Sequence, residues 1–203
     1  MKKIAHTLLG IVCISLLIAS ISTAVCAAPQ GKAKGVRFES YAMDNDYFSC
    51  KVPADWTLER DKDKDEDYKI YEIQLLAPKA DKAPTSVFVS YYAKENEDFS
   101  DFQNFISRNS TNVFGETKSV RENYEPLKRV TVAGRKGFEL SNEVMEYLNP
   151  QSKSDESVQL KEKMYVLPAK DGFYVLKYSA QKSAFIENLP VFEKIAKSFK
   201  GKP

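Results

Sequence analysis

The sequence predicts an α+β fold, an α/β/α sandwich in which helices pack on a central, mainly antiparallel sheet. Apolar and polar residues alternate along most of the candidate strands, which is the period of a strand with one buried face. Short turn-forming segments join these strands, and such consecutive hairpins are typical of antiparallel sheets. The segment 190–199 carries apolar residues at helical spacing, so we expect an amphipathic helix that covers the sheet.

Four candidate strands lie in the N-terminal half of the domain. In the second of them, Phe48, Cys50 and Val52 share one face, so Cys50 is expected to be a small buried thiol. Trp56 follows a proline turn and is interpreted as a core residue. The strands are expected at 36–42, 47–52, 69–76 and 85–93.

A middle helix is predicted at 100–109. Ser100 and Gln103 have the spacing of a capping box, and Phe102, Phe105 and Ile106 continue at helical spacing. This helix would add a second cover for the sheet.

Two hairpins and a terminal helix are predicted in the C-terminal half. Gly134 can adopt the positive φ of a tight turn, and 168–172 combines a proline with an Asp-Gly step. A polar loop at 149–157 separates the two hairpins, and Pro190 suits the first turn of the terminal helix. The strands are expected at 126–132, 136–147, 164–167 and 173–179.

Residues 1–27 have the pattern of a secretory signal peptide. Lys2 and Lys3 precede an apolar run from 8 to 21, and small residues follow. The run is short for a bilayer span, so we expect a periplasmic or secreted protein with no integral membrane span after processing.

The cleavage site has two candidates, after Ala27, which we favour, and after Ala24. Acylation of Cys26, as in a lipoprotein, is disfavoured because the residues before it lack the usual leucine. Cleavage after Ala24 would leave Cys26 free to pair with Cys50, whereas cleavage after Ala27 leaves Cys50 alone. Residues 28–35 are then expected to form a flexible polar leader, and residues 36–200 a single domain. We expect the protein to be a monomer.

Charge and histidine content exclude several classes of function. The chain has 30 Lys+Arg and 28 Asp+Glu, and loss of Lys2 and Lys3 with the signal leaves 28 of each. A near-neutral protein has no general electrostatic attraction for nucleic acid. His6, the only histidine, also lies in the signal, which excludes histidine-based triads and histidine-ligated metals.

The charged run 59–69 contains a pattern that suggests a metal. Four acidic residues match positions 1, 3, 5 and 12 of an EF-hand calcium loop: Asp61, Asp63, Asp65 and Glu72. Glu66 replaces the glycine of that loop and the flanks resemble strands, so a solvated hairpin tip is the alternative. The candidates for weak calcium binding are Asp61, Asp63, Asp65 and Asp67, and no other cofactor is expected.

Four motifs follow one another in a recognisable order: Pro53-x-x-Trp56, a hairpin at 132–137, an aromatic hairpin at 165–176 and a helix ending at Phe199. This order resembles the PsbP-like family, α/β/α sandwiches that include extrinsic photosystem II subunits and the related envelope protein DcrB. The resemblance covers roughly 38–199. It implies a non-enzymatic binding or assembly module and no particular ligand.

Three hypotheses about function follow. The first is a non-enzymatic secreted or periplasmic module that binds an envelope protein, with its site on the polar loops 59–69 and 149–157. The second is a weak calcium-binding envelope adaptor acting through 61–67. The third is a carboxylate-based hydrolase, which requires a pocket where two carboxylates converge; no catalytic residue is assigned.

Overall fold

A computed structural model describes residues 35–80, 82–149, 151 and 154–202. The predicted signal peptide at 1–27, the cleavage sites, Cys26 and most of the leader at 28–35 lie outside these residues. The signal, the site of its removal and the pairing of Cys26 therefore stay predictions.

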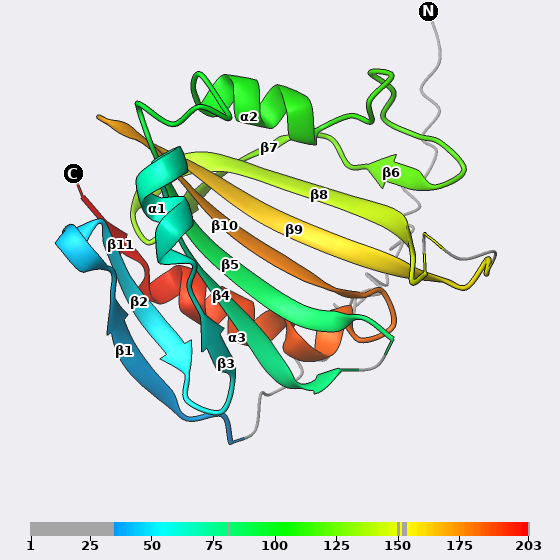
Figure 1. Ribbon diagram of the computed structural model, residues 1–203, viewed down its shortest axis with the longest axis horizontal. Helices are drawn as coiled ribbons and strands as arrows, with labels where there is room; N and C mark the ends of the chain where they lie inside the picture. Colours follow the sequence, from blue (N-terminus) through cyan, green and yellow to red (C-terminus); the bar gives the residue numbers. More distant parts are fainter. Residues whose placement is uncertain (1–34, 81, 150, 152–153, 203) are drawn as a thin grey trace, which may run out of the picture. The chain divides into compact units, whose positions relative to one another are not determined.

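Within the described residues, eight strands form the large sheet on which the domain is built (Figure 1). Its order is β3-β4-β5-β10-β9-β8-β6, and β7 pairs with β8 beside β6. Every pair in it is antiparallel, which confirms the predicted α+β class. The strands are β3 (Thr57–Glu59), β4 (Ile70–Ala80), β5 (Pro84–Ala93), β6 (Glu122–Tyr124), β7 (Lys128–Val132), β8 (Arg135–Tyr147), β9 (Ser157–Ala169) and β10 (Gly172–Gln181).

A small sheet of order β1-β2-β11 forms a separate layer. Its strands are β1 (Phe38–Ala42), β2 (Phe48–Pro53) and β11 (Lys200–Gly201), and the 3₁₀ turn η1 (Asp44–Asp46) joins the first two. β11 was not predicted, because a two-residue strand has no detectable period. It exists because Lys200 pairs with Ser49 at the edge of β2.

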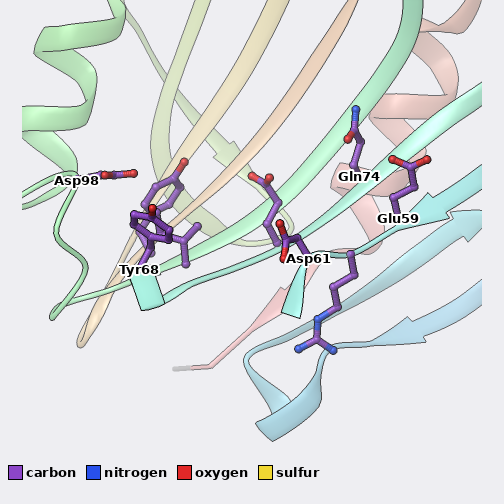
Figure 2. Close-up of a pocket in the computed structure, with 9 residues that line it drawn as sticks. Glu59, Asp61, Tyr68, Gln74 and Asp98 are labelled. Atoms are coloured by element: carbon purple, nitrogen blue, oxygen red, sulfur yellow. The ribbon is translucent and has the colours of Figure 1, made fainter. Parts of the chain in front are cut away.

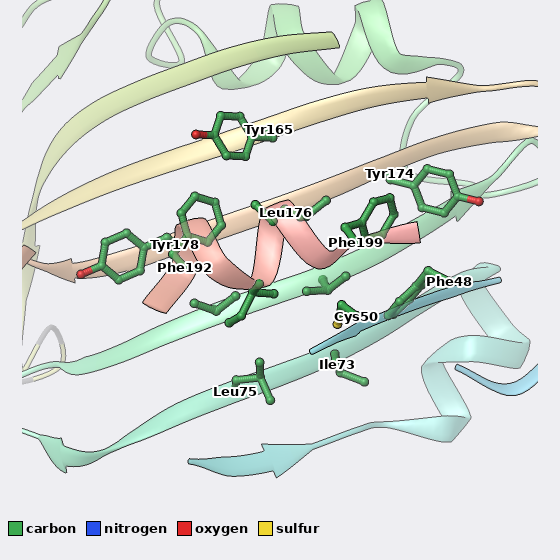
Figure 3. Close-up of a cluster of buried hydrophobic side chains, with 14 of the residues drawn as sticks. Phe48, Cys50, Ile73, Leu75, Tyr165, Tyr174, Leu176, Tyr178, Phe192 and Phe199 are labelled. Carbon is green, nitrogen blue, oxygen red and sulfur yellow. The ribbon is translucent and has the colours of Figure 1, made fainter. Parts of the chain in front are cut away.

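Helix α3 (Phe185–Ser198) and the small sheet cover one face of the large sheet, which we call the α3 face. Phe192 is fully buried and stacks on Tyr165 and Tyr178, with ring centroids 5.4 and 5.5 Å apart. Figure 3 shows α3 lying over these aromatic side chains. Burial of large aromatic rings contributes most of the core energy of a domain of this size.

Helix α2 (Phe102–Asn109) covers part of the opposite face, which we call the α2 face. Phe105 packs against Phe173 on β10 and belongs to the same cluster as Met164 and Val166 on β9. Consecutive residues of a strand point to opposite faces, so Met164 and Tyr165 face different helices. The prediction of helices packed on the sheet is confirmed.

Cys50 and Trp56 are both core residues, as predicted. Cys50 is 4 % exposed and Trp56 is 8 % exposed. Burial raises the pKa of the Cys50 thiol to about 12, so the thiolate is absent at neutral pH.

The structure corrects the expectation of a loop or hairpin tip within the charged run. Residues Lys62–Tyr68 form a short helix, α1. The Asp61 carboxylate accepts a hydrogen bond from the Asp63 N–H (3.2 Å), and acidic residues in the first turn suit the positive end of the helix dipole. This helix was not predicted because a run of alternating charges has no apolar residues at helical spacing.

The boundaries of three other elements also differ from the prediction. Asp101, rather than Ser100, caps α2 by accepting from the Asn104 N–H (2.8 Å). Helix α3 begins at Phe185, five residues before Pro190, because Phe185 is buried against Tyr178. The connection at 168–172 is a two-residue turn, since Ala169 pairs with Gly172.

Candidate functional site

A polar cavity of about 490 Å³ lies on the α2 face, near the edge formed by β3 and β4. Its size is in the range of small-ligand sites in proteins. Figure 2 shows that side chains from several elements border it. The lining residues are Glu59, Arg60, Asp61, Tyr68, Ile70, Glu72, Gln74, Tyr92 and Asp98.

Strand register places the floor and one wall of the cavity. Glu59 on β3 pairs with Gln74 on β4, and the two lie side by side in Figure 2. Glu72 lies two residues before Gln74, so alternation directs it to the same face. The Ser90 hydroxyl donates a hydrogen bond to the Glu72 carboxylate (2.6 Å), which fixes that side chain on the sheet.

The other wall comes from the last residue of α1 and from the loop that precedes α2. Tyr68 closes α1, and Asp98 lies just before α2, with its carboxylate directed toward the Tyr68 side of the cavity in Figure 2. Tyr92 on β5 stacks on Phe173 with ring centroids 4.8 Å apart. Tyr92 therefore has a fixed ring rather than a mobile one.

The charge of the lining is acidic. Among the described residues of the lining, Glu59, Asp61, Glu72 and Asp98 contribute four carboxylates, and Arg60 contributes one basic side chain.

Arg60 is itself engaged by carboxylates outside the lining. Its guanidinium binds Asp65 through Nη2 (2.5 Å) and Asp44 through Nη1 (2.7 Å). The hydrogen bond from Arg60 lowers the pKa of Asp44. The charge of Arg60 is thus shared with carboxylates outside the lining.

Tyr92 is held as a neutral phenol. Burial, together with the negative charges of Glu72 and Asp98, raises the pKa of Tyr92 well above its usual value. Its hydroxyl can therefore donate a hydrogen bond at any physiological pH. A cavity with carboxylates and a fixed aromatic ring is suited to ammonium or guanidinium groups.

The structure places the predicted calcium ligands along α1 and at its start. Residues two apart on a helix do not face each other, so the carboxylates of Asp61, Asp63, Asp65 and Asp67 do not surround one point. Asp65 is bound by Arg60. Within the described residues, no group of three or more acidic, cysteine or histidine side chains is arranged for a metal ion. Calcium binding at these four residues stays a prediction.

Sequence reasoning identified only part of this site. The run 59–69 contributes Glu59, Arg60, Asp61 and Tyr68 to the lining. The second predicted loop, 149–157, contributes none of the lining residues; there, Glu156 pairs with Lys82 (2.9 Å).

The residues that sequence reasoning missed are Glu72, Gln74, Tyr92 and Asp98. The polar side of the strand at 69–76 was the available signal for the first two. Nothing in the sequence indicated that Tyr92 and Asp98 would lie beside them.

No protein-family model matches the chain, and no curated protein matches it. Solved structures do resemble it, at low identity. A solution structure of a cyanobacterial PsbP from Synechocystis has 13 % identity and a TM-score of 0.49, over 86 % of this chain and all of that one. A PsbP is thus among the solved structures to which this chain is similar.

Two further structures are comparable. A crystal structure from Bacteroides thetaiotaomicron has 11 % identity and a TM-score of 0.49; the match covers 81 % of this chain but only 48 % of that chain. LpqN, involved in cell envelope biogenesis of Mycobacterium tuberculosis, has 12 % identity and a TM-score of 0.46, over 83 % of this chain and 92 % of that one. At these values the matches carry no argument about function.

No helix among the described residues has the length and apolar character needed to cross a membrane.

Proposed function

We propose that this protein is a non-enzymatic binding module of the cell envelope that uses the acidic cavity to bind a basic segment of a partner protein. The observation that carries the proposal is the lining itself. Four carboxylates line the cavity, and Arg60, the basic lining residue, is engaged by Asp44 and Asp65. A lysine or arginine side chain that entered would gain charge-assisted hydrogen bonds in a partly enclosed site.

The aromatic residues support the same ligand class. Tyr68 is half exposed at the rim, and the Tyr92 ring is fixed by Phe173. An ammonium or guanidinium group near such rings gains a cation–π contribution of about 0.5–2 kcal/mol. Export to the envelope rests on the signal-peptide pattern at 1–27.

The test is binding of a fluorescent oligolysine and a fluorescent oligoglutamate, measured by anisotropy at low and high salt. The double variant Glu59→Gln/Asp98→Asn removes two charges from the lining. We expect oligolysine to bind, and the double variant to bind it about tenfold more weakly, because each lost charge pair weakens association.

Glu187→Gln, an exposed carboxylate on α3, is the matched control and should leave oligolysine binding unchanged. If both peptides bind equally, or if Glu187→Gln weakens binding as much as the double variant, the cavity is not the site. If the cavity is the site, a partner crosslinked in an envelope fraction should be recovered with the wild type and lost with the double variant.

Carboxylate-based hydrolysis is a second candidate, favoured by the presence of four carboxylates in the lining of one cavity. It is tested with a panel of nitrophenyl glycosides and esters. If the wild type turns over one of these substrates and the Glu59→Gln/Asp98→Asn variant does not, the site is catalytic rather than a binding site.

A weak calcium-binding adaptor is the third candidate, with Asp61, Asp63, Asp65 and Asp67 as the acidic ligands. It is tested by calorimetry with millimolar calcium, comparing the wild type with Asp63→Asn/Asp67→Asn. Absence of binding heat in the wild type would exclude it.

A further inference from the structure

The strand β7 has an outer edge that no other described strand pairs with. It pairs only with β8, from Lys128 opposite Glu139 to Val132 opposite Arg135. An edge strand presents a row of unpaired N–H and C=O groups that can add a further strand.

The direction of these backbone groups follows from the turn that joins β7 to β8. Ala133 and Gly134 both have positive φ, 48° and 81°, which defines a two-residue type I′ hairpin. In such a turn Val132 and Arg135 are the hydrogen-bonded pair, so Val130 and Val132 direct their backbone groups to β8. Arg129 and Thr131 therefore direct theirs outward, away from the sheet.

A second cavity, of about 440 Å³, lies beside this edge on the α3 face. Val130 and Val132 line it from β7, and Ala196 and Lys197 line it from α3. Glu193, also in the lining, is bound by Lys163 (2.8 Å) and by the Tyr165 hydroxyl (2.9 Å). The lining beside the strand is thus mainly apolar, with Lys197 at its margin.

The other side of the same edge is basic. Register places Arg129 beside Phe138, and Thr131 beside Lys136, on the α2 face. Arg129 and Lys136 are exposed and have no carboxylate partner among the residues that the structure describes. Lys128, in contrast, is paired with Glu125 and Glu139.

We infer that the outer edge of β7 is a docking site for an extended peptide that adds as a strand and alternates apolar with acidic residues. Alternation along the added strand would direct its apolar residues into the cavity beside Val130 and Val132. Its acidic residues would lie on the other face, near Arg129 and Lys136. This surface is separate from the acidic cavity, and it selects the opposite charge.

Charged residues on an edge strand also protect it from aggregation. That role would be fulfilled by Lys128 and Arg129 alone. It does not require a cavity beside the strand, and the cavity is the observation that favours a bound side chain.

The probe is a fluorescent peptide of about six residues that alternates valine and glutamate, the length of an average strand. Two comparison peptides alternate valine with lysine, or contain the same valines and glutamates in two blocks. We expect the valine–glutamate peptide to bind the full protein at least about tenfold more tightly than either comparison, because only it matches both faces of the edge.

Three variants test the geometry. Thr131→Pro removes an outward N–H without touching the β7–β8 ladder and should weaken binding about tenfold. Arg129→Glu should weaken the valine–glutamate peptide and strengthen the valine–lysine peptide. Lys51→Glu, a charge reversal at an exposed position on β2, is the matched control and should change neither.

Circular dichroism and the thermal midpoint of each variant show whether it is folded. Equal binding of the three peptides, or unchanged binding by folded Thr131→Pro and Arg129→Glu, would overturn the inference. If the wild type is a dimer and Thr131→Pro dissociates it, the edge binds a second copy of the chain. That result would overturn the inference that a peptide occupies it.

Discussion

The two faces of the large sheet differ in how completely they are covered. On the α3 face, a fourteen-residue helix and a second sheet bury a continuous aromatic core. On the α2 face, an eight-residue helix covers only part of the strands. Such a helix is roughly 12 Å long, whereas the thirteen-residue β9 extends over roughly 43 Å.

The uncovered part of the α2 face has small or paired polar side chains instead of large apolar ones. Ser86, Ser90 and Ser179 lie there, and Glu162 pairs with Lys177 (2.6 Å). The acidic cavity opens at the same face. The difference indicates that the α3 face contributes most of the stability, while the α2 face leaves space for the acidic cavity.

The largest expected effect is on the α3 face. Phe192→Ala should lower the free energy of unfolding by about 4 kcal/mol, because it leaves a cavity between Tyr165 and Tyr178. Phe88→Ala, on the uncovered part of the α2 face, should lower it by only about 1 kcal/mol. Urea unfolding measures both, and equal losses would contradict the division between the faces.

An intermediate effect is expected where α1 joins the domain. Arg60→Met leaves the buried carboxylate of Asp65 without its counter-charge and should lower the free energy of unfolding by about 3 kcal/mol.

The double variant Arg60→Met/Asp65→Leu removes the uncompensated charge as well. It should be more stable than Arg60→Met alone. A double variant that is less stable than the single one would show that the pair is not what anchors α1.

Alkaline pH should weaken the α3 face. Burial raises the pKa of Tyr91 and of Tyr165 to about 12, against 10.0 for a free phenol. The pKa of each phenol is higher in the folded state than in the unfolded state. The folded state is therefore fully stable with respect to these two groups below pH 10, and it loses stability as the pH rises toward 12. The prediction is tested by measuring phenolate absorbance and unfolding together across this pH range. Tyr165→Phe should reduce the loss of stability at alkaline pH. An unchanged loss in that variant would contradict the prediction.

The smallest effect on stability is expected in the acidic cavity. Asp98→Asn should change the free energy of unfolding by less than about 0.5 kcal/mol, because Asp98 is exposed. The same variant should weaken oligolysine binding measurably. A large loss of stability would assign Asp98 to the structure of the domain rather than to a site.

Alternation and turn chemistry were sufficient to predict most of the sheet. The strands at 85–93 and 136–147 were located within one residue of their observed ends, since each has one buried face and is bounded by turns. Helix α1 was missed because a run of alternating charges has no apolar period. Its formation depends on the cap from Asp61 and on Arg60, which holds Asp65.

The candidate site was predicted only where it is local in sequence. Glu59 and Asp61 were in a named loop, whereas Glu72 and Asp98 join them through strand pairing and the position of α2. The unpaired edge of β7 could not be predicted either, because it also depends on which strands pair. A sequence shows that 128–132 can be a strand, but not that one of its sides stays unpaired.

By itself the sequence determined the antiparallel α+β class and the burial of Cys50 and Trp56. These properties follow from local period, side-chain size and composition. Only the tertiary structure decided which face is covered, which carboxylates meet, and where an edge is left open. Those properties depend on register and helix placement, which bring together residues far apart in the chain.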